Sequence, residues 1–129
     1  MPISCIYPIY FKNAFSHLEG GYSSCGKGCY FAVEAKYSVN DNYCTANEQH
    51  ERFIFLVSVV TGEYCEVKEK DAEKLTMPPE IPNKSGMRYD SVINDARSSL
   101  PRKSMFAVFD DNAACPIYLI RFRLVCDPV

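Results

Sequence analysis

Runs of apolar and aromatic residues divide the chain into short segments that predict strands. The clearest run is FIFLVSVV at residues 53–60, which is unbroken and rich in β-branched and aromatic side chains. Such a run predicts a central strand that is buried on both faces. Thr61-Gly62 closes it, because glycine favours a turn. Shorter runs predict further strands at residues 29–33, 89–93, 104–110 and 117–125.

The segments between these runs are polar or contain glycine and proline, and they predict loops and one short helix. Four glycines make residues 20–28 a loop by composition, and residues 34–42 predict a short helix or helical turn. The charged residues 63–74 predict a solvated strand end or a loop. The remaining segments are an extended, proline-rich connector at 77–82, a link between the last two strands at 111–116, and residues 1–19, which show no period and receive no assignment. Several strands and few helices predict an α+β or mainly β fold.

Length and composition place the chain among ordinary globular domains. The 129 residues suffice for one domain, and 47% of them are hydrophobic. The formal net charge of −2 does not attract a polyanion, so direct nucleic-acid binding is not expected. Pro8 breaks the apolar N-terminus, and no run approaches the ~20 residues of a membrane span. Neither a signal peptide nor a membrane partner is therefore expected.

The seven cysteines form an odd, scattered set and do not suggest a disulfide framework. Cys25 and Cys29 make the one close pair, and neither histidine supplies the second pair that a structural zinc site needs. Buried or idle thiols are therefore the default interpretation, and no metal is expected. Reduced thiols favour the cytoplasm or the nucleus.

Glycine and tyrosine residues near the start of residues 29–33 offer the first hint of a ligand site. No Ser/His/Asp arrangement, zinc-protease helix or Walker loop occurs in the sequence, and Gly26-Lys27-Gly28 alone indicates a turn. A planar ligand lying against this glycine-rich backbone would be walled by Tyr30, Tyr37 or Tyr43. Alternatively, these tyrosines are half-buried core residues with hydrated hydroxyls, and the pattern alone favours that interpretation.

Four segments read together change this balance. They are residues 26–38 (GKGCYFAVEAKYS), 55–65 (FLVSVVTGEYC), 89–95 (YDSVIND), and 105–110 (MFAVFD) running into 116–122 (PIYLIRF). In this order and spacing they resemble the C-terminal part of the PARP-type ADP-ribosyltransferase catalytic domain, in its mono-ADP-ribosyltransferase branch. The resemblance implies an α+β fold with a split, mainly antiparallel sheet and few short helices, which holds NAD in a cleft. It divides the chain into an unassigned front segment, 1–25, and a partial catalytic domain, 26–129.

The resemblance also assigns residues to the NAD site. In the family a His-Tyr-Glu triad surrounds the nicotinamide riboside, and its tyrosine falls at Tyr30. A serine eight positions further on bonds the carboxamide, and Ser38 has that spacing. A second tyrosine stacks on the nicotinamide ring, and Tyr43 is the candidate, with Tyr37 as the alternative. The resemblance thus implies that NAD contacts Gly28, Tyr30, Phe31, Ala32, Ser38, Tyr37 and Tyr43.

Two departures from the family pattern bear on activity. The triad glutamate, which would orient the acceptor hydroxyl during chain elongation, falls at Met105. A thioether cannot replace a carboxylate as acceptor of that hydrogen bond, so poly(ADP-ribose) synthesis is not expected. The triad histidine belongs to a His-Gly pair on an early strand, and the chain contains no His-Gly. His17 is followed by leucine and is interpreted as an ordinary loop residue, so the family's early strand and adenosine-side wall are expected to be missing.

The resemblance therefore implies an NAD-dependent transfer of one ADP-ribose to protein acceptors with release of nicotinamide. The transfer is expected to be weak because the His-Gly pair is absent. NAD is then a substrate, and no metal is implied. The alternative is a catalytically inactive module that acts in protein interaction. A third possibility is a truncated product that folds poorly and leaves a long sheet edge open to pairing.

Overall fold

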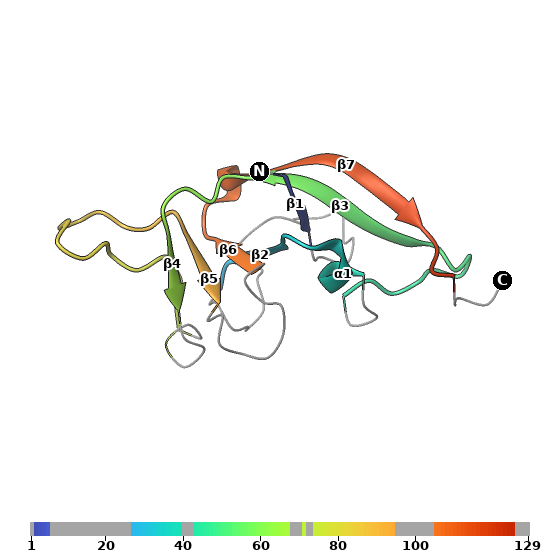
Figure 1. Cartoon of the computed structure of the whole chain (residues 1–129), viewed down its shortest axis with the longest axis horizontal. Coiled ribbons are helices and arrows are strands. Elements are labelled where there is room, and N and C mark those ends of the chain that lie inside the picture. The colour runs from blue at the N-terminus through green and yellow to red at the C-terminus, as the bar shows by residue number, and fades with distance from the viewer. Residues whose placement is uncertain are drawn as a thin grey trace.

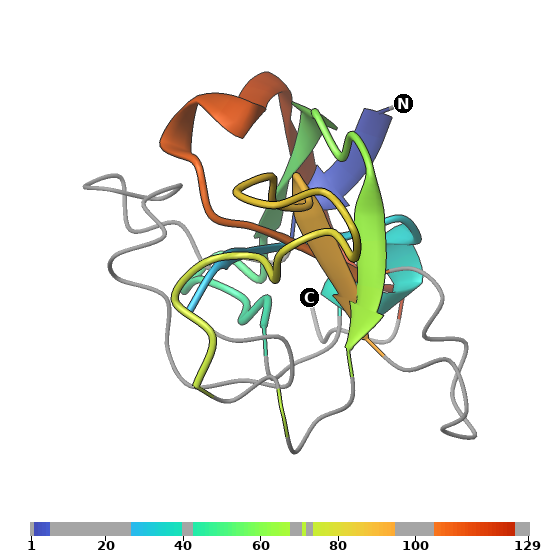
Figure 2. The same ribbon diagram turned by 90° about the vertical axis from the view of Figure 1, so that its left-hand side faces the viewer.

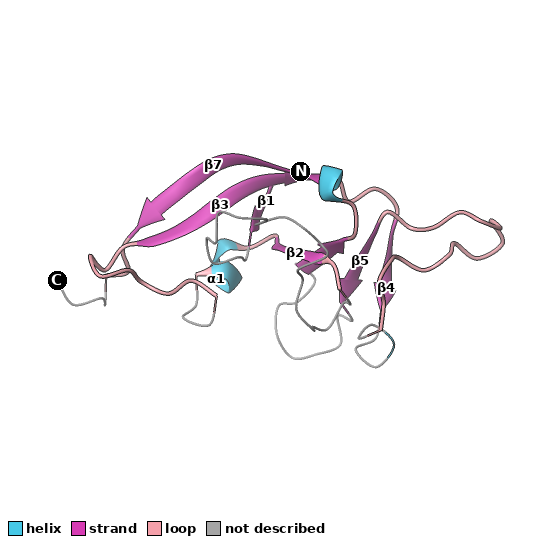
Figure 3. Ribbon diagram, turned by 180° about the vertical axis from the view of Figure 1, so that it is seen from behind, coloured by secondary structure: helices cyan, strands magenta, loops and turns pink. Residues whose placement is uncertain are grey.

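The computed structural model describes residues 2–5, 27–39, 43–67, 71, 74–94 and 105–125. These residues form a seven-stranded sheet and two single-turn helices (Figures 1 and 3). The strands are β1 (Pro2–Cys5), β2 (Cys29–Ala32), β3 (Arg52–Val59), β4 (Tyr64–Val67), β5 (Ser91–Asn94), β6 (Met105–Val108) and β7 (Ala114–Phe122). The helices are α1 (Ala35–Ser38) and the 3₁₀ turn η2 (Asp111–Ala113). The α+β, mainly sheet fold is therefore confirmed.

The strands lie in the order β4-β5-β6-β2-β1-β3-β7. Five of the six neighbouring pairs are antiparallel, and β4 and β5 run parallel. β1 lies between β2 and β3 and pairs antiparallel with both. The N-terminal residues, which received no assignment from the sequence, thus contribute an inner strand. The division of the chain at residue 25 stays a prediction.

Most predicted strands occur within two residues of their expected ends, and the differences have local causes. The predicted helix at 34–42 shrinks to α1, because Glu34 makes no side-chain cap and one turn gains little from its own hydrogen bonds. The connector predicted at 111–116 contains η2 and the first residues of β7, including Pro116. Proline is tolerated there because β7 is an edge strand. β7 also ends at Phe122, before the predicted residue 125.

The turn from β3 to β4 is clasped by the residues that begin β5. The Glu63 N–H donates to Asp90 Oδ2 at 2.7 Å, and the Asp90 N–H donates to the Glu63 carbonyl at 2.8 Å. The Ser91 hydroxyl donates to the Thr61 carbonyl at 2.6 Å. Gly62 has a φ of +53°, and a Cβ there would lie 2.1 Å from the Asp90 carboxylate, so this turn requires glycine. The clasp fixes the parallel start of β4 beside β5.

Residues 74–90 form an arm that projects beyond β4 and β5 (Figures 1 and 2). The prolines of this segment were predicted to prevent a helix and a strand. One isolated β-bridge forms here, between Glu80 and Arg88. The Tyr89 N–H donates to the Pro79 carbonyl at 3.1 Å, and Arg88 Nη1 donates to the Pro78 carbonyl at 2.9 Å. Among the described residues, no helix is both long and apolar enough to cross a membrane.

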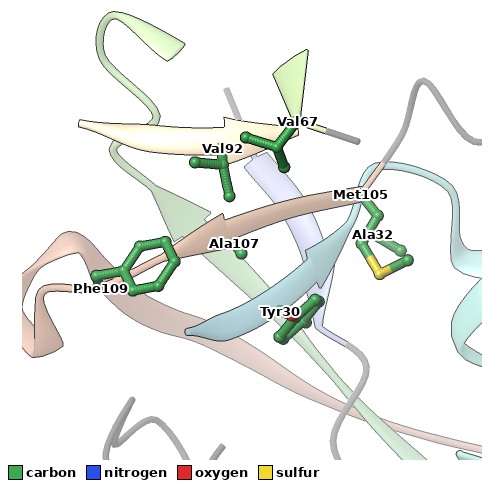
Figure 4. Packing of buried hydrophobic residues seen from close by; sticks show 7 residues of the cluster. All are labelled: Tyr30, Ala32, Val67, Val92, Met105, Ala107 and Phe109. Atoms are coloured by element: carbon green, nitrogen blue, oxygen red, sulfur yellow. The ribbon is translucent and has the colours of Figure 1, made fainter. Parts of the chain in front are cut away.

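Alternating side chains of β2 and β6 build one hydrophobic cluster on each face of the sheet. We call the first the tyrosine-face cluster, and Figure 4 shows its members: Tyr30, Ala32, Val67, Val92, Met105, Ala107 and Phe109. We call the second the opposite-face cluster: Cys29, Phe31, Val57, Val59 and Val108. Both faces of β2 are therefore covered, and all four of its residues are buried. The candidate site belongs to the tyrosine face.

Candidate functional site

Tyr30 and Met105, the two predicted triad positions, lie on the same face of adjacent strands. Antiparallel pairing of β2 and β6 places Tyr30 opposite Ala107, and Ala32 opposite Met105. Tyr30 and Met105 are therefore diagonal neighbours across the pair. Both belong to the tyrosine-face cluster, at 6% and 8% exposure (Figure 4). The structure thus brings the tyrosine and the apolar substitute for the glutamate together.

The position of Gly28 requires glycine because β6 approaches it closely. A Cβ at Gly28 would lie 2.8 Å from the Val108 carbonyl oxygen and 3.3 Å from Phe109. Any side chain here would push β6 away from β2, which would separate Tyr30 from Met105. The space beside Gly28 is therefore occupied by β6. A contact between NAD and the backbone of Gly28 remains a prediction.

Phe31 points away from the other predicted site residues. Successive side chains of a strand alternate between the two faces, so Phe31 and Tyr30 lie on opposite sides of β2. Phe31 is fully buried in the opposite-face cluster with Val57 and Val59. Its side chain does not share the tyrosine face, so its predicted contact with NAD likewise concerns its backbone. Ala32 does share that face.

Tyr37 and Tyr43, offered by the sequence as alternatives for one role, lie together as a pair. Their ring centroids are 5.4 Å apart, with 21° between the ring planes, so the rings are stacked. Their hydroxyl oxygens are 3.2 Å apart, and one hydroxyl donates to the other. Both rings pack, partly buried, against the tyrosine-face cluster. The cluster that contains Tyr30 and Met105 is thus extended by two aromatic rings.

Ser38 lies in the same helical turn as Tyr37 and carries a buried hydroxyl. The turn is closed by the Val39 N–H, which donates to the Ala35 carbonyl at 3.0 Å. The Ser38 side chain is 1% exposed, and its Oγ has no hydrogen-bond partner within the residues that the structure describes. Leaving a buried hydroxyl unpaired costs about 1–3 kcal/mol. The Ser38 hydroxyl therefore retains the capacity to donate one hydrogen bond and to accept others.

Two cysteine side chains, one on each face of the sheet, are held in the neutral form. Burial, reinforced by the negative charge of Asp111, raises the pKa of the Cys29 thiol to about 11. Burial also raises the pKa of Cys65, against a smaller opposing effect of a backbone hydrogen bond. Neutral buried thiols are poor nucleophiles and poor metal ligands. In the described ranges, no group of three or more His, Cys, Asp or Glu side chains could hold a metal ion.

The two histidines do not add to the described site. His17 lies outside the described residues. His50 lies in the turn before β3, with a φ of +58°, and is not a member of the tyrosine-face cluster. The chemistry of the described site therefore rests on tyrosine hydroxyls, one serine hydroxyl and apolar surface.

Several apolar residues of the site were not singled out by sequence reasoning. Phe109, Val92 and Val67 complete the tyrosine-face cluster, and Cys65 and Leu75 pack against it. The period-two pattern of Met105, Ala107 and Phe109 could have identified Phe109, which directly follows β6 and belongs to the same cluster as the other two. Leu75 comes from the arm, and its carbonyl accepts a hydrogen bond from the Lys27 N–H at 2.8 Å. No periodicity links these two segments, so sequence alone could not find this contact.

Comparison with known proteins shows which family the sequence resembles. The family described as the poly(ADP-ribose) polymerase catalytic domain matches residues 11–124. Human protein mono-ADP-ribosyltransferase PARP14 is 34% identical over 115 residues, which are 87% of this chain and 6% of that protein. Mouse PARP10, also titled a protein mono-ADP-ribosyltransferase, is 33% identical over 95 residues, or 74% of this chain and 9% of that protein. Mouse PARP12, with the same title, is 29% identical over 106 residues, or 82% and 13%. The chain therefore spans a small fraction of these relatives.

Proposed function

The chain belongs to the poly(ADP-ribose) polymerase catalytic domain family, and on that premise we propose that it is an NAD-dependent mono-ADP-ribosyltransferase domain. It transfers a single ADP-ribose to protein acceptors and releases nicotinamide. The similarity to relatives of the mono-ADP-ribosyltransferase branch supports this class of reaction. Residues 26–129 form the catalytic part. The thiols of Cys29, Cys65 and Cys115 are free, which supports the cytoplasm or the nucleus as the compartment.

The unpaired hydroxyl of Ser38 is the observation that carries this proposal. A hydroxyl buried to 1% exposure can donate one hydrogen bond and accept others. The carboxamide of nicotinamide supplies both an acceptor oxygen and donor N–H groups. Binding of nicotinamide would therefore satisfy a group that the described fold leaves unsatisfied. The stacked rings of Tyr37 and Tyr43 offer aromatic surface beside it for the flat pyridinium ring.

The reaction that this site would support is a substitution at the nicotinamide-bearing ribose carbon. The bond from C1″ to the pyridinium nitrogen breaks, the electron pair passes to the ring, and neutral nicotinamide leaves. The acceptor forms a new bond to C1″ as oxocarbenium character develops. Tyr30, Ser38 and the tyrosine pair contribute by holding the leaving group in one orientation, which lowers the entropic part of the barrier.

Met105 at the glutamate position restricts the product to one ADP-ribose. Its side chain is 8% exposed and has no carboxylate with which to orient a ribose hydroxyl for a second transfer. An acceptor carboxylate of a target protein needs no such base, because its ordinary pKa of roughly 4 leaves it ionised at neutral pH. The apolar residue therefore fits an acceptor that arrives already deprotonated. No metal is required by this scheme.

Two buried serines provide a matched test. Ser38→Ala removes the unpaired hydroxyl, so we expect nicotinamide affinity to fall about tenfold while stability is unchanged or rises. Ser91→Ala removes a hydroxyl that donates to the Thr61 carbonyl at 2.6 Å, so we expect a loss of about 1 kcal/mol in stability with affinity preserved. Calorimetric titration with nicotinamide gives the affinities, and urea unfolding gives the stabilities. Equal affinity of wild type and Ser38→Ala would contradict the assignment of Ser38.

Transfer itself is measured by incubation with labelled NAD and a protein acceptor mixture. We expect nicotinamide release and mass spectra with one ADP-ribose on each modified site. The second candidate function is a catalytically inactive module that acts in protein interaction. It is favoured by Met105 and by the absence of a His-Gly pair from the sequence. Nicotinamide binding without label transfer would select it over the transferase.

A further inference from the structure

The hydrogen bond between the Tyr37 and Tyr43 hydroxyls restrains the two rings beyond what stacking alone provides. Two stacked rings pack through their faces, and a 5.4 Å centroid distance at 21° already provides that contact. The 3.2 Å bond between the hydroxyl oxygens adds a second restraint. A stack restrains the separation and tilt of two rings, and the bond restrains their rotation over one another. The two contacts together therefore define one orientation of Tyr43 relative to Tyr37.

The two tyrosines differ in how their backbones are held. Tyr37 belongs to α1, where its own N–H donates to the Glu34 carbonyl at 3.1 Å. Tyr43 lies in a turn, outside the helices and strands. Its ring therefore takes its orientation from side-chain contacts more than from its backbone. Tyr37 is the residue with which it makes both a stacked and a hydrogen-bonded contact.

We propose that Tyr37 is a positioning residue: it backs one face of the Tyr43 ring and holds the other face ready to stack on nicotinamide. This inference rests on the proposed function, because it assigns the ligand-stacking role to Tyr43. Tyr37 precedes Ser38 in the same helical turn. One turn of helix thus carries both the hydroxyl for the carboxamide and the support for the stacking ring. A ring that is already oriented loses less freedom when the ligand binds, which strengthens binding.

The test compares tyrosine variants on the two faces of the sheet. Tyr37→Phe keeps the ring and removes the hydroxyl bond, whereas Tyr37→Leu removes the stack as well. The control is Tyr64→Phe, because Tyr64 also contacts an aromatic ring, that of Phe106, at a centroid distance of 5.2 Å. Phe106 packs on the opposite-face cluster, away from the proposed site. Calorimetry with nicotinamide measures affinity, and the upfield NMR shift of the nicotinamide protons reports stacking. Thermal unfolding establishes that each variant is folded at the temperature used.

We expect Tyr37→Phe to weaken nicotinamide binding about threefold to tenfold. Tyr37→Leu is expected to weaken binding by about tenfold or more and to reduce the upfield shift of the bound ligand. Tyr64→Phe should bind like wild type. The double variant with Tyr37→Phe and Tyr43→Phe should bind no more weakly than either single variant, because both remove the same hydrogen bond.

Four results would overturn the inference. Affinity and upfield shift that are unchanged in both Tyr37 variants would show that Tyr43 needs no support. Tighter binding by Tyr37→Leu would show that Tyr37 occupies the place of the ligand. Additive losses in the double variant would show that the two hydroxyls act separately. In these three cases wild type still binds nicotinamide and the proposed function stands. A wild-type chain that does not bind nicotinamide would remove the proposed function and this inference together.

Discussion

The middle of the sheet and its β7 edge use similar apolar residues but bury them very differently. In β2 and β6, seven of the eight residues are buried and the eighth is partly exposed, because both faces of these strands are covered. In β7, the apolar residues Ile117, Tyr118, Leu119 and Ile120 are 40% to 64% exposed. β7 pairs along its whole length with β3 and forms the edge of the sheet (Figures 1 and 3). An apolar strand therefore becomes core only where other elements cover its faces.

This difference locates the candidate site. The tyrosine-face cluster fixes Tyr30 and Met105 with little exposure, and two further tyrosines pack on it. Around β7, the exposed side chains of Arg121 and Arg123, at 68% and 59% exposure, approach the Glu51 carboxylate at 3.7 and 3.6 Å, and the Glu51 side chain is 21% exposed. Exposed ion pairs of this kind contribute little to stability. Among the described residues, the covered part of the sheet holds the closely packed side chains to which we assign the leaving group.

The largest expected difference in unfolding free energy is between a tyrosine of the covered region, Tyr30, and a tyrosine of the exposed region, Tyr118. Tyr30→Ala empties part of the tyrosine-face cluster, and we expect it to lower the free energy of unfolding by about 3–5 kcal/mol. Tyr118→Ala, at 64% exposure, should change it by no more than about 0.5 kcal/mol. Urea unfolding measures both values. Similar losses in the two variants would mean that the covered and exposed halves do not differ in packing as described.

A smaller effect concerns the thiols of the two regions at alkaline pH. The pKa of Cys29 is raised in the folded chain from 9.0 to about 11, so the unfolded chain releases this proton first. Stability should therefore be complete below pH 9 and should fall as the pH rises from 9 to 11, by at most about 3 kcal/mol. Cys29→Ala should reduce this fall, and Cys115→Ala, which removes an exposed thiol of β7, should not. The measurement is urea unfolding at a series of pH values. Identical alkaline profiles for the two variants would contradict the burial of Cys29.

Strands that carry their own pattern could be predicted from the sequence. The unbroken run of residues 53–60 identified β3, and shorter runs identified β2, β5 and β6. The prediction that residues 53–60 form a central strand buried on both faces was wrong, because β3 lies beside the edge strand β7 and four of its eight residues are buried. β1 was missed because residues 2–5 show no alternation, and their pairing depends on β2 and β3, which are distant in sequence. The start of β7 was missed because Pro116 indicates a loop unless the strand is known to lie at an edge. Local patterns thus predict strands, but not which partners cover them.

The arrangement of the candidate site residues was predicted in part, for related reasons. The family resemblance led to Tyr30 and Met105, and the structure places both in one cluster. The orientation of Phe31 followed from strand alternation and could have been predicted from Tyr30 alone. The pairing of Tyr37 with Tyr43 could not, because it depends on the path of the chain between them. Tyr37 and Tyr43, which the sequence offers as alternatives, are therefore partners. Sequence spacing alone does not distinguish these two cases.

The smallest expected effect on stability tests the exposed half directly. Leu119→Lys places a charge at a position of β7 that is 47% exposed, and we expect the free energy of unfolding to change by no more than about 0.5 kcal/mol. The comparison variant is Val57→Thr on the neighbouring strand β3, where the side chain is fully buried, and we expect a loss of about 1–3 kcal/mol from the unpaired hydroxyl. An exposed apolar edge strand also favours pairing between molecules, so Leu119→Lys should reduce self-association in concentration-dependent sedimentation. A large loss of stability in Leu119→Lys would mean that this face of β7 is covered in solution, and the contrast between the two halves would disappear.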